Sequence, residues 1–111
     1  MNIQLIKESK KWWESFDYYD QIWLLAIHDK ELLPRKTPLL PENTSKNQIV
    51  GMYVSTLSSQ WWSKLTEDEA FDITQKYFFD QQLGNHDPEK LERSEIETIF
   101  LKEFFPETIE P

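Results

Sequence analysis

The sequence contains no cysteine, which excludes disulfide bonds and thiolate metal sites. It has only two glycines, and none of them forms a Gly-rich phosphate-binding loop. The longest unbroken apolar run, residues 22–27, is far shorter than the roughly 20 residues that a membrane-spanning helix needs. Residues 1–6 lack the basic and apolar regions of a signal peptide. We therefore expect a soluble, cytoplasmic protein with no metal, cofactor or membrane partner.

Positive charge is scarce in the second half of the chain. The formal net charge is −8 at pH 7. Residues 1–60 contain seven Lys or Arg and seven Asp or Glu, whereas residues 61–111 contain five and thirteen. This asymmetry argues against direct binding of nucleic acid, which needs cationic contacts to phosphate. It favours an encounter with a basic protein surface, and solubility alone is the alternative explanation.

Aromatic residues, in contrast, are abundant: the chain has five Trp, four Tyr and seven Phe. Each buried aromatic side chain removes roughly 150–250 Å² from water, so a core forms without covalent cross-links. The length of 111 residues is usual for one domain. We predict a single domain over 1–111.

Few glycines, together with many Glu, Lys, Leu and Gln, favour helix. We predict an all-α, mostly helical fold, a compact bundle of about five helices. Its parts are an N-terminal helical pair (1–33), a Pro-rich loop (34–47), acidic C-terminal helices (48–105) and a frayed tail (106–111).

Apolar stripes indicate which faces of the first two helices are buried. In the first helix, over about 3–15, the stripe joins Ile3, Ile6, Lys10 and Trp13. In the second, which Asp17 caps and Pro34 ends, the predicted inward residues share helical spacing. They are Tyr19, Ile22, Trp23, Ala26 and Ile27, with Leu24 and Leu25 widening the stripe.

Capping boxes mark the later helix starts. Ser45 with Gln48 predicts a helix over about 46–64, and Thr66 with Glu69 one over about 67–83, with Gly84 just past its end. The 49–57 segment keeps a strand, and hence an α+β fold, as an alternative because it contains β-branched residues, namely Ile49, Val50, Val54 and Thr56.

The last helix is predicted to open at Ser94 with Glu97 and to stop at Pro106. Its predicted inward residues are Ile96, Ile99, Phe100 and Phe104.

Two tryptophan pairs are the most unusual feature. Trp12–Trp13 and the acidic cap that follows recur 49 residues later as Trp61–Trp62, which indicates a duplicated helix-turn-helix unit or convergent capping chemistry. Adjacent helical residues point about 100° apart. We expect one Trp of each pair to face the core, and Trp12 and Trp62 are candidates for a partner-binding or self-association surface. A large aromatic core is the alternative.

No residue combination indicates catalysis. Neither His28 nor His86 has a second ligand at the spacing that would place two ligands on one helical face. The densest carboxylates, in residues 67–72, occupy a helix N-terminus, where the helix dipole stabilises negative charge. We assign no catalytic, cofactor or metal residue and expect a protein that is not an enzyme.

Carboxylates on a rigid helical scaffold can imitate the spacing of phosphates and enter a cation-lined channel. A solvated helical face is the alternative explanation. The candidate partner-binding residues are Asp68, Asp72, Glu92, Glu95, Glu97 and Glu103.

The segment from Trp61 to Glu103 resembles small acidic accessory proteins of phages and mobile elements, including anti-CRISPR-type inhibitors. The similarity covers less than half of the chain. The stretches that carry it are an aromatic followed by the helix start Leu65-Thr66-x-x-Glu69, then Lys76-Tyr77-Phe78, a loop, and Ser94-Glu95-Ile96-Glu97-x-Ile99.

This resemblance implies an interaction protein without enzymatic residues. We expect a protein-binding inhibitor or regulator, in the manner of a phage counter-defence protein, that docks on a basic groove of a nucleic-acid-processing effector. The alternative is a homo-oligomeric helical module, such as a homodimer, whose surface tryptophans form the interface.

Overall fold

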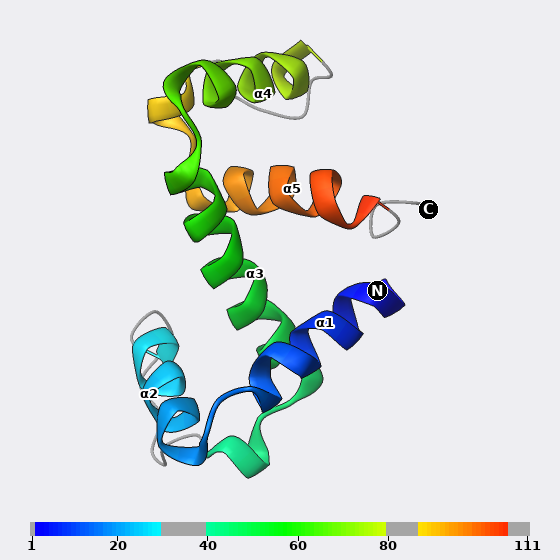
Figure 1. Ribbon diagram of the computed structural model, residues 1–111, viewed down its shortest axis with the longest axis vertical. Helices are drawn as coiled ribbons and strands as arrows, with labels where there is room; N and C mark the ends of the chain where they lie inside the picture. The colour runs from blue at the N-terminus through cyan, green and yellow to red at the C-terminus, as the bar shows by residue number, and fades with distance from the viewer. Residues whose placement is uncertain (1, 30–39, 80–86, 107–111) are drawn as a thin grey trace. The chain divides into compact units, whose positions relative to one another are not determined.

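The computed structural model describes residues 2–29, 40–79 and 87–106. Within these ranges the chain forms five α-helices, two 3₁₀ helices and no strand, so the predicted all-α fold is confirmed (Figure 1). No helix in these ranges has both the length and the apolar character needed to cross a membrane. The elements are α1 (Ile3–Glu14), α2 (Tyr18–Asp29), η1 (Pro41–Asn43), α3 (Lys46–Lys64), α4 (Glu67–Phe79), η2 (Pro88–Lys90) and α5 (Arg93–Phe104).

Several predicted features lie outside the described residues. They are the end of the second helix at Pro34, the first part of the Pro-rich loop, Gly84, His86 and the tail over 107–111. In the second part of that loop, η1 is a short regular element that the prediction did not contain.

Local capping sets the helix starts. Ser45 and Gln48 form the predicted reciprocal box: the Gln48 N–H donates to Ser45 Oγ at 3.2 Å, and the Ser45 N–H donates to Gln48 Oε1 at 2.8 Å. The predicted start of the last helix is wrong in detail. The helix begins at Arg93, and the Glu92 N–H donates to the Glu95 carboxylate at 3.1 Å, so the box lies two residues before Ser94.

The strand alternative for 49–57 is wrong, because α3 runs unbroken through these residues (Figure 1). Helix propensities of ordinary residues differ by at most about 0.7 kcal/mol. Burying one valine side chain is worth about 1.5–3 kcal/mol, and both Val50 and Val54 are buried. Burial in the helical conformation therefore outweighs their β preference.

The chain divides into two compact units, residues 1–53 and 54–111. The division falls inside α3, between Tyr53 and Val54, and not in the Pro-rich loop. The single domain over 1–111 stays a prediction, and each unit is described by itself. We call them unit 1 and unit 2.

Unit 1 is organised around a buried cluster of Trp13, Leu25 and Met52 from three helices. In α1 the predicted stripe is partly wrong. Trp13 is buried, but the other buried residues of α1 are Leu5 and Ser9, and Ile3 is 70 % exposed. The Ser9 hydroxyl donates to the Ile6 carbonyl oxygen at 3.0 Å, so its polar group is satisfied inside the helix.

The predicted inward face of α2 is partly wrong, because of its residues only Leu24 and Leu25 are packed. Its packed side contains Leu25, with Leu24 packed against the cluster, and Gln21, whose Nε2 donates to the Trp13 carbonyl oxygen at 2.9 Å. The helix has apolar residues on both sides, and periodicity alone does not tell which side packs. The other residues predicted to face inward are exposed, namely Tyr19, Ile22, Trp23, Ala26 and Ile27.

Unit 2 contains a second cluster, in which Tyr77 of α4 and Ile99 of α5 are buried. Residues Trp61, Trp62, Ile73 and Leu91 pack against these two. Ile99 and Phe100 are buried as predicted, but Phe104 is exposed and meets Trp61 only edge-on, with ring centroids 5.5 Å apart.

Gly51 lies in the interior of α3, and a β-carbon added there would meet no atom within 4 Å. Replacing it by alanine removes the entropic cost of a helical glycine without a clash. We expect Gly51→Ala to raise the unfolding free energy by about 0.5–1 kcal/mol, as measured by urea unfolding followed by circular dichroism. The reverse change at an exposed helical site, Ala26→Gly, should lower it by a similar amount. A Gly51→Ala protein less stable than the parent would contradict the helix at this position.

Candidate functional site

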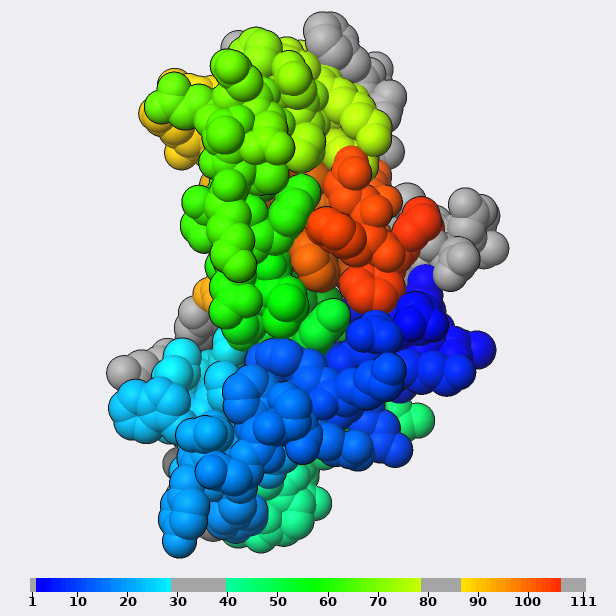
Figure 2. Space-filling model, viewed as in Figure 1, coloured from blue at the N-terminus to red at the C-terminus, as the bar shows by residue number. Residues whose placement is uncertain are grey.

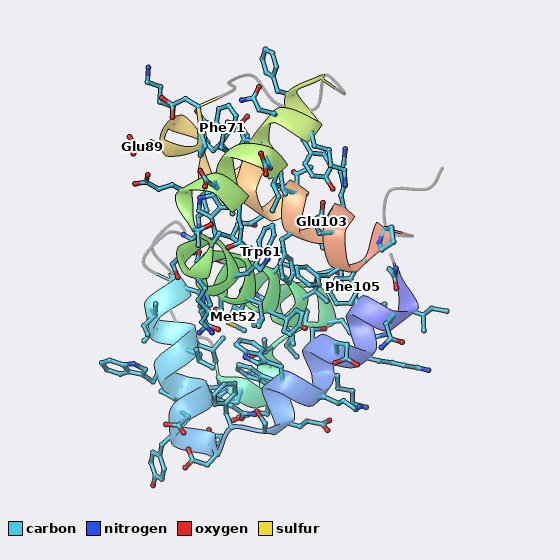
Figure 3. The ribbon with its side chains drawn as sticks, turned by 45° about the horizontal axis from the view of Figure 1, so that its top comes forward. Met52, Trp61, Phe71, Glu89, Glu103 and Phe105 are labelled. Atoms are coloured by element: carbon cyan, nitrogen blue, oxygen red, sulfur yellow. The ribbon has the colours of Figure 1, made fainter. Side chains whose placement is uncertain are left out.

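A cleft of about 460 Å³ opens in unit 2, between the end of α3, the first turns of α4 and η2. Its aromatic lining comes from Trp62 of α3 and Phe71 of α4. Figure 3 shows Phe71 close to Glu89 of η2. The volume of the cleft falls within the range of about 300–1,000 Å³ that is usual for ligand-binding clefts.

The cleft is strongly acidic. Four carboxylates line it, and none of the described residues that line it is basic. We call this site the acidic cleft. Its carboxylates are Glu67, Asp68, Asp87 and Glu89.

Local backbone structure holds these carboxylates in place. Thr66 caps α4 and accepts the Glu69 N–H at 3.2 Å, so Glu67 and Asp68 lie in the first helical turn. On the opposite wall, Asp87 caps η2 by accepting the Glu89 N–H at 3.0 Å. Both walls of the cleft are thus helix starts, where short polar residues are favoured.

The electrostatic balance of the cleft is negative. The N-terminus of α4 contributes roughly half a positive charge through its free N–H groups. The four carboxylates exceed this several-fold. A cation is therefore the favoured occupant.

Beside the cleft, Glu69 keeps its charge to lower pH than an ordinary glutamate. The Thr66 N–H donates to Glu69 Oε1 at 3.0 Å, and the Thr66 backbone and side chain together lower the pKa of Glu69.

The aromatic lining adds a second kind of attraction. Phe71 is 51 % exposed, and Trp62 is half-buried. An aromatic face attracts a cation by about 0.5–1 kcal/mol at exposed sites. The methylene groups of a lysine or arginine side chain can also pack on it. The arrangement suits a long side chain with a positive end group.

The structure brings together two of the residues singled out in the sequence, Asp68 and Trp62, which both line the acidic cleft. Asp72 lies exposed on α4, outside the lining. At the start of α5, Glu92 and Glu95 act in helix capping, and Glu97 is half-buried on that helix.

Glu103 has a role inside unit 2. Its carboxylate accepts the Tyr77 hydroxyl at 2.5 Å and pairs with Lys76 Nζ at 3.2 Å. Because Tyr77 belongs to the buried cluster, this carboxylate helps to join α5 to α4.

Trp12 is half-buried in unit 1, and its partner Trp13 is buried. The Trp12 ring packs edge-on against Phe16 at 5.2 Å and Tyr53 at 5.7 Å between centroids. A role of Trp12 in binding a partner stays a prediction.

Sequence reasoning missed Phe71, Asp87 and Glu89. An aromatic residue close after an acidic helix start was the available signal for Phe71. The approach of η2 to α4 is a tertiary contact that no local pattern encodes. No group of three or more potential metal ligands occurs among the residues that the structure describes.

Comparison of the chain with protein-family models, with curated proteins and with solved structures found no match.

We expect Glu103→Lys to lower the unfolding free energy by about 1–3 kcal/mol, because it removes a charged acceptor from the partly buried Tyr77 hydroxyl. Asp72→Lys makes the same charge change at an exposed site on α4 and should stay within about 0.5 kcal/mol of the parent. Chemical denaturation of both variants measures the difference. Equal effects would show that Glu103 acts only through net charge.

We expect Glu69→Ala to weaken folding at neutral pH and to matter progressively less in acid. Because the folded-state pKa of Glu69 lies below its ordinary value of 4.5, its contribution is present above that value and is lost as the pH falls through the folded-state pKa. Unfolding of parent and variant from pH 7 to acid measures this. Thr66→Ala removes the hydroxyl that supports the charge, so its unfolding free energy should change less with pH than that of the parent. A difference between the parent and Glu69→Ala that is the same at all pH values contradicts the assignment.

Proposed function

We propose that this chain is a non-enzymatic protein-binding module whose acidic cleft takes up a lysine or arginine side chain from a basic surface of its partner. The observation that carries the proposal is the composition of that cleft: four carboxylates and two aromatic side chains, with no basic residue among the described lining. Cations and aromatic faces attract each other, and a carboxylate pairs with a guanidinium or ammonium group.

The proposed partner is a nucleic-acid-processing effector, which the chain inhibits or regulates. Proteins that bind nucleic acid present basic surfaces to phosphate. The excess negative charge of residues 61–111 attracts such surfaces. A chain docked there excludes the nucleic acid. In the phage or mobile-element setting that the resemblance implies, this is the role of a counter-defence, anti-CRISPR-like inhibitor.

The binding step can be tested with a short arginine-rich peptide and a matched peptide that has glutamine in place of arginine. We expect only the arginine peptide, and not the glutamine peptide, to bind and to shift the NMR signals of Phe71, Asp87 and Glu89. Its affinity should fall as the salt concentration rises. Asp68→Lys combined with Glu89→Lys should weaken its affinity at least about tenfold, about 1.4 kcal/mol.

A matched control separates the cleft from net charge. Glu8→Lys with Glu14→Lys makes the same change in net charge on α1, in unit 1. The affinity of this control for the arginine peptide should stay within about threefold of that of the parent. Similar losses in both double variants would show that bulk charge, and not the cleft, attracts the peptide, and the proposal would then fail.

The aromatic part of the proposal has its own control. Phe71 and Phe104 are exposed to nearly the same extent, 51 % and 52 %. Only Phe71 lines the cleft. Phe71→Ala should weaken the binding of the arginine peptide, and Phe104→Ala should not. Circular dichroism checks that both variants remain folded.

The inhibitor part requires the partner itself. A tagged chain is incubated with nuclease-treated host lysate and washed with increasing salt. We expect one basic nucleic-acid-binding protein to be retained, to elute as salt rises, and to be displaced by added nucleic acid. A retained protein that nucleic acid does not displace would contradict inhibition by exclusion.

A further inference from the structure

Unit 1 exposes one face of α2 that is apolar and rich in aromatic residues. Tyr19 is 80 % and Trp23 68 % exposed, and Ile22, Ala26 and Ile27 are exposed as well. We call these five residues the outer face of α2. Their spacing of i, i+3, i+4, i+7 and i+8 forms one continuous stripe. Figure 2 shows α2, coloured blue to cyan, at the surface of unit 1.

The opposite side of α2 is already packed, with Leu24 and Leu25 in the cluster around Trp13. The helix is thus apolar on both sides. A helix of this kind is normally buried on both, and scattered surface residues do not account for a contiguous stripe.

We propose that the outer face of α2 pairs with the same face of a second copy of this chain, with the two α2 helices antiparallel. Such a pair has two-fold symmetry, so each copy contributes the same surface. With the symmetry axis near Trp23, the two Trp23 side chains meet, and Tyr19 of each copy faces Ile27 of the other.

The charge balance of residues 1–60 argues against a basic partner at the outer face of α2. Residues 1–60 carry seven basic and seven acidic residues, whereas all the excess negative charge lies in 61–111. The excess negative charge that opposes the pairing of two copies is thus carried by residues 61–111, and salt screens it. A basic partner is expected at the acidic residues instead, because nothing in the balance of residues 1–60 attracts it.

The charges along α2 select the antiparallel orientation. Asp17 and Asp20 are exposed at its N-terminal end, and the helix ends with His28 and Asp29. An antiparallel pair keeps the N-terminal aspartates of the two helices apart and aligns the helix dipoles favourably. A parallel pair places the two acidic ends together.

The available area indicates a weak, reversible dimer. An aromatic side chain buries roughly 150–250 Å², so the outer face offers on the order of 400–500 Å² per copy. The total of both copies lies near the lower limit of about 1,000 Å² for specific association.

One contact reduces the cost of ordering the face. The Tyr18 hydroxyl donates to Glu42 at 3.2 Å, and its ring lies edge-on to Tyr19 with centroids 6.3 Å apart. The ring of Tyr19 is therefore supported before a second copy binds.

Sedimentation of the full chain over a range of concentrations tests the pairing. We expect the mass to rise from 13.4 kDa toward twice that value with concentration. Trp23→Ala and Ile22→Lys should keep it monomeric. Two controls, Ile3→Ala on α1 and Phe71→Ala in the acidic cleft, also remove exposed apolar side chains and should leave the dimer intact. A parent that is monomeric at every concentration, or a dimer that Trp23→Ala leaves unchanged, overturns the proposal.

The absence of cysteine allows the orientation to be tested directly. Tyr19→Cys and Ile27→Cys chains are mixed and oxidised. The antiparallel pair gives a mixed 19–27 disulfide, because a disulfide needs Cα atoms about 4.4–6.8 Å apart. Disulfides between two copies of the same variant, 19–19 or 27–27, would instead indicate parallel helices and overturn the proposed orientation. The controls also separate this proposal from the proposed function: Phe71→Ala tests the acidic cleft, and Trp23→Ala tests only the outer face of α2.

Discussion

The burial of side chains along α3 is the constraint on which both units depend. Ile49 and Met52 contribute to the cluster of unit 1, and Trp61 and Trp62 contribute to that of unit 2. α3 is one continuous helix of 19 residues, and its first part packs in unit 1 and its last part in unit 2. The β-branched residues Val50 and Val54 in its first half are buried in the helical conformation. A strand would turn successive residues to opposite faces and would separate side chains that the helix places together.

Two groups of acidic residues in unit 2 have different physical roles. Glu69, Glu95 and Glu103 accept hydrogen bonds from backbone or side-chain donors, so their charges are used within the fold. The carboxylates of the acidic cleft stand around an open, partly aromatic space, and one of them, Asp87, also accepts the Glu89 N–H. Net charge alone does not distinguish the groups. The proposed binding of a basic partner depends on the second group, and the stability of unit 2 depends on the first.

The two proposed surfaces use different forces. The acidic cleft attracts a cation by charge, an interaction that salt screens over about 10 Å at ordinary ionic strength. The outer face of α2 is apolar and lies in a part of the chain without net charge, so its association follows from removing apolar surface from water. A change in salt concentration should therefore affect the binding of a basic partner and self-association through α2 to different extents.

The amino-acid sequence by itself determined the helical class and the helix starts at Tyr18, Lys46 and Glu67, because capping involves residues at most a few positions apart. It also contained Asp68 and Trp62 as candidates for binding. Only the tertiary structure decided which side of α2 is packed, since two apolar stripes on one helix are equivalent until a neighbour covers one of them. The tertiary structure likewise decided that η2 brings Asp87 and Glu89 to Phe71, because contacts between segments distant in the chain depend on packing that no local pattern specifies.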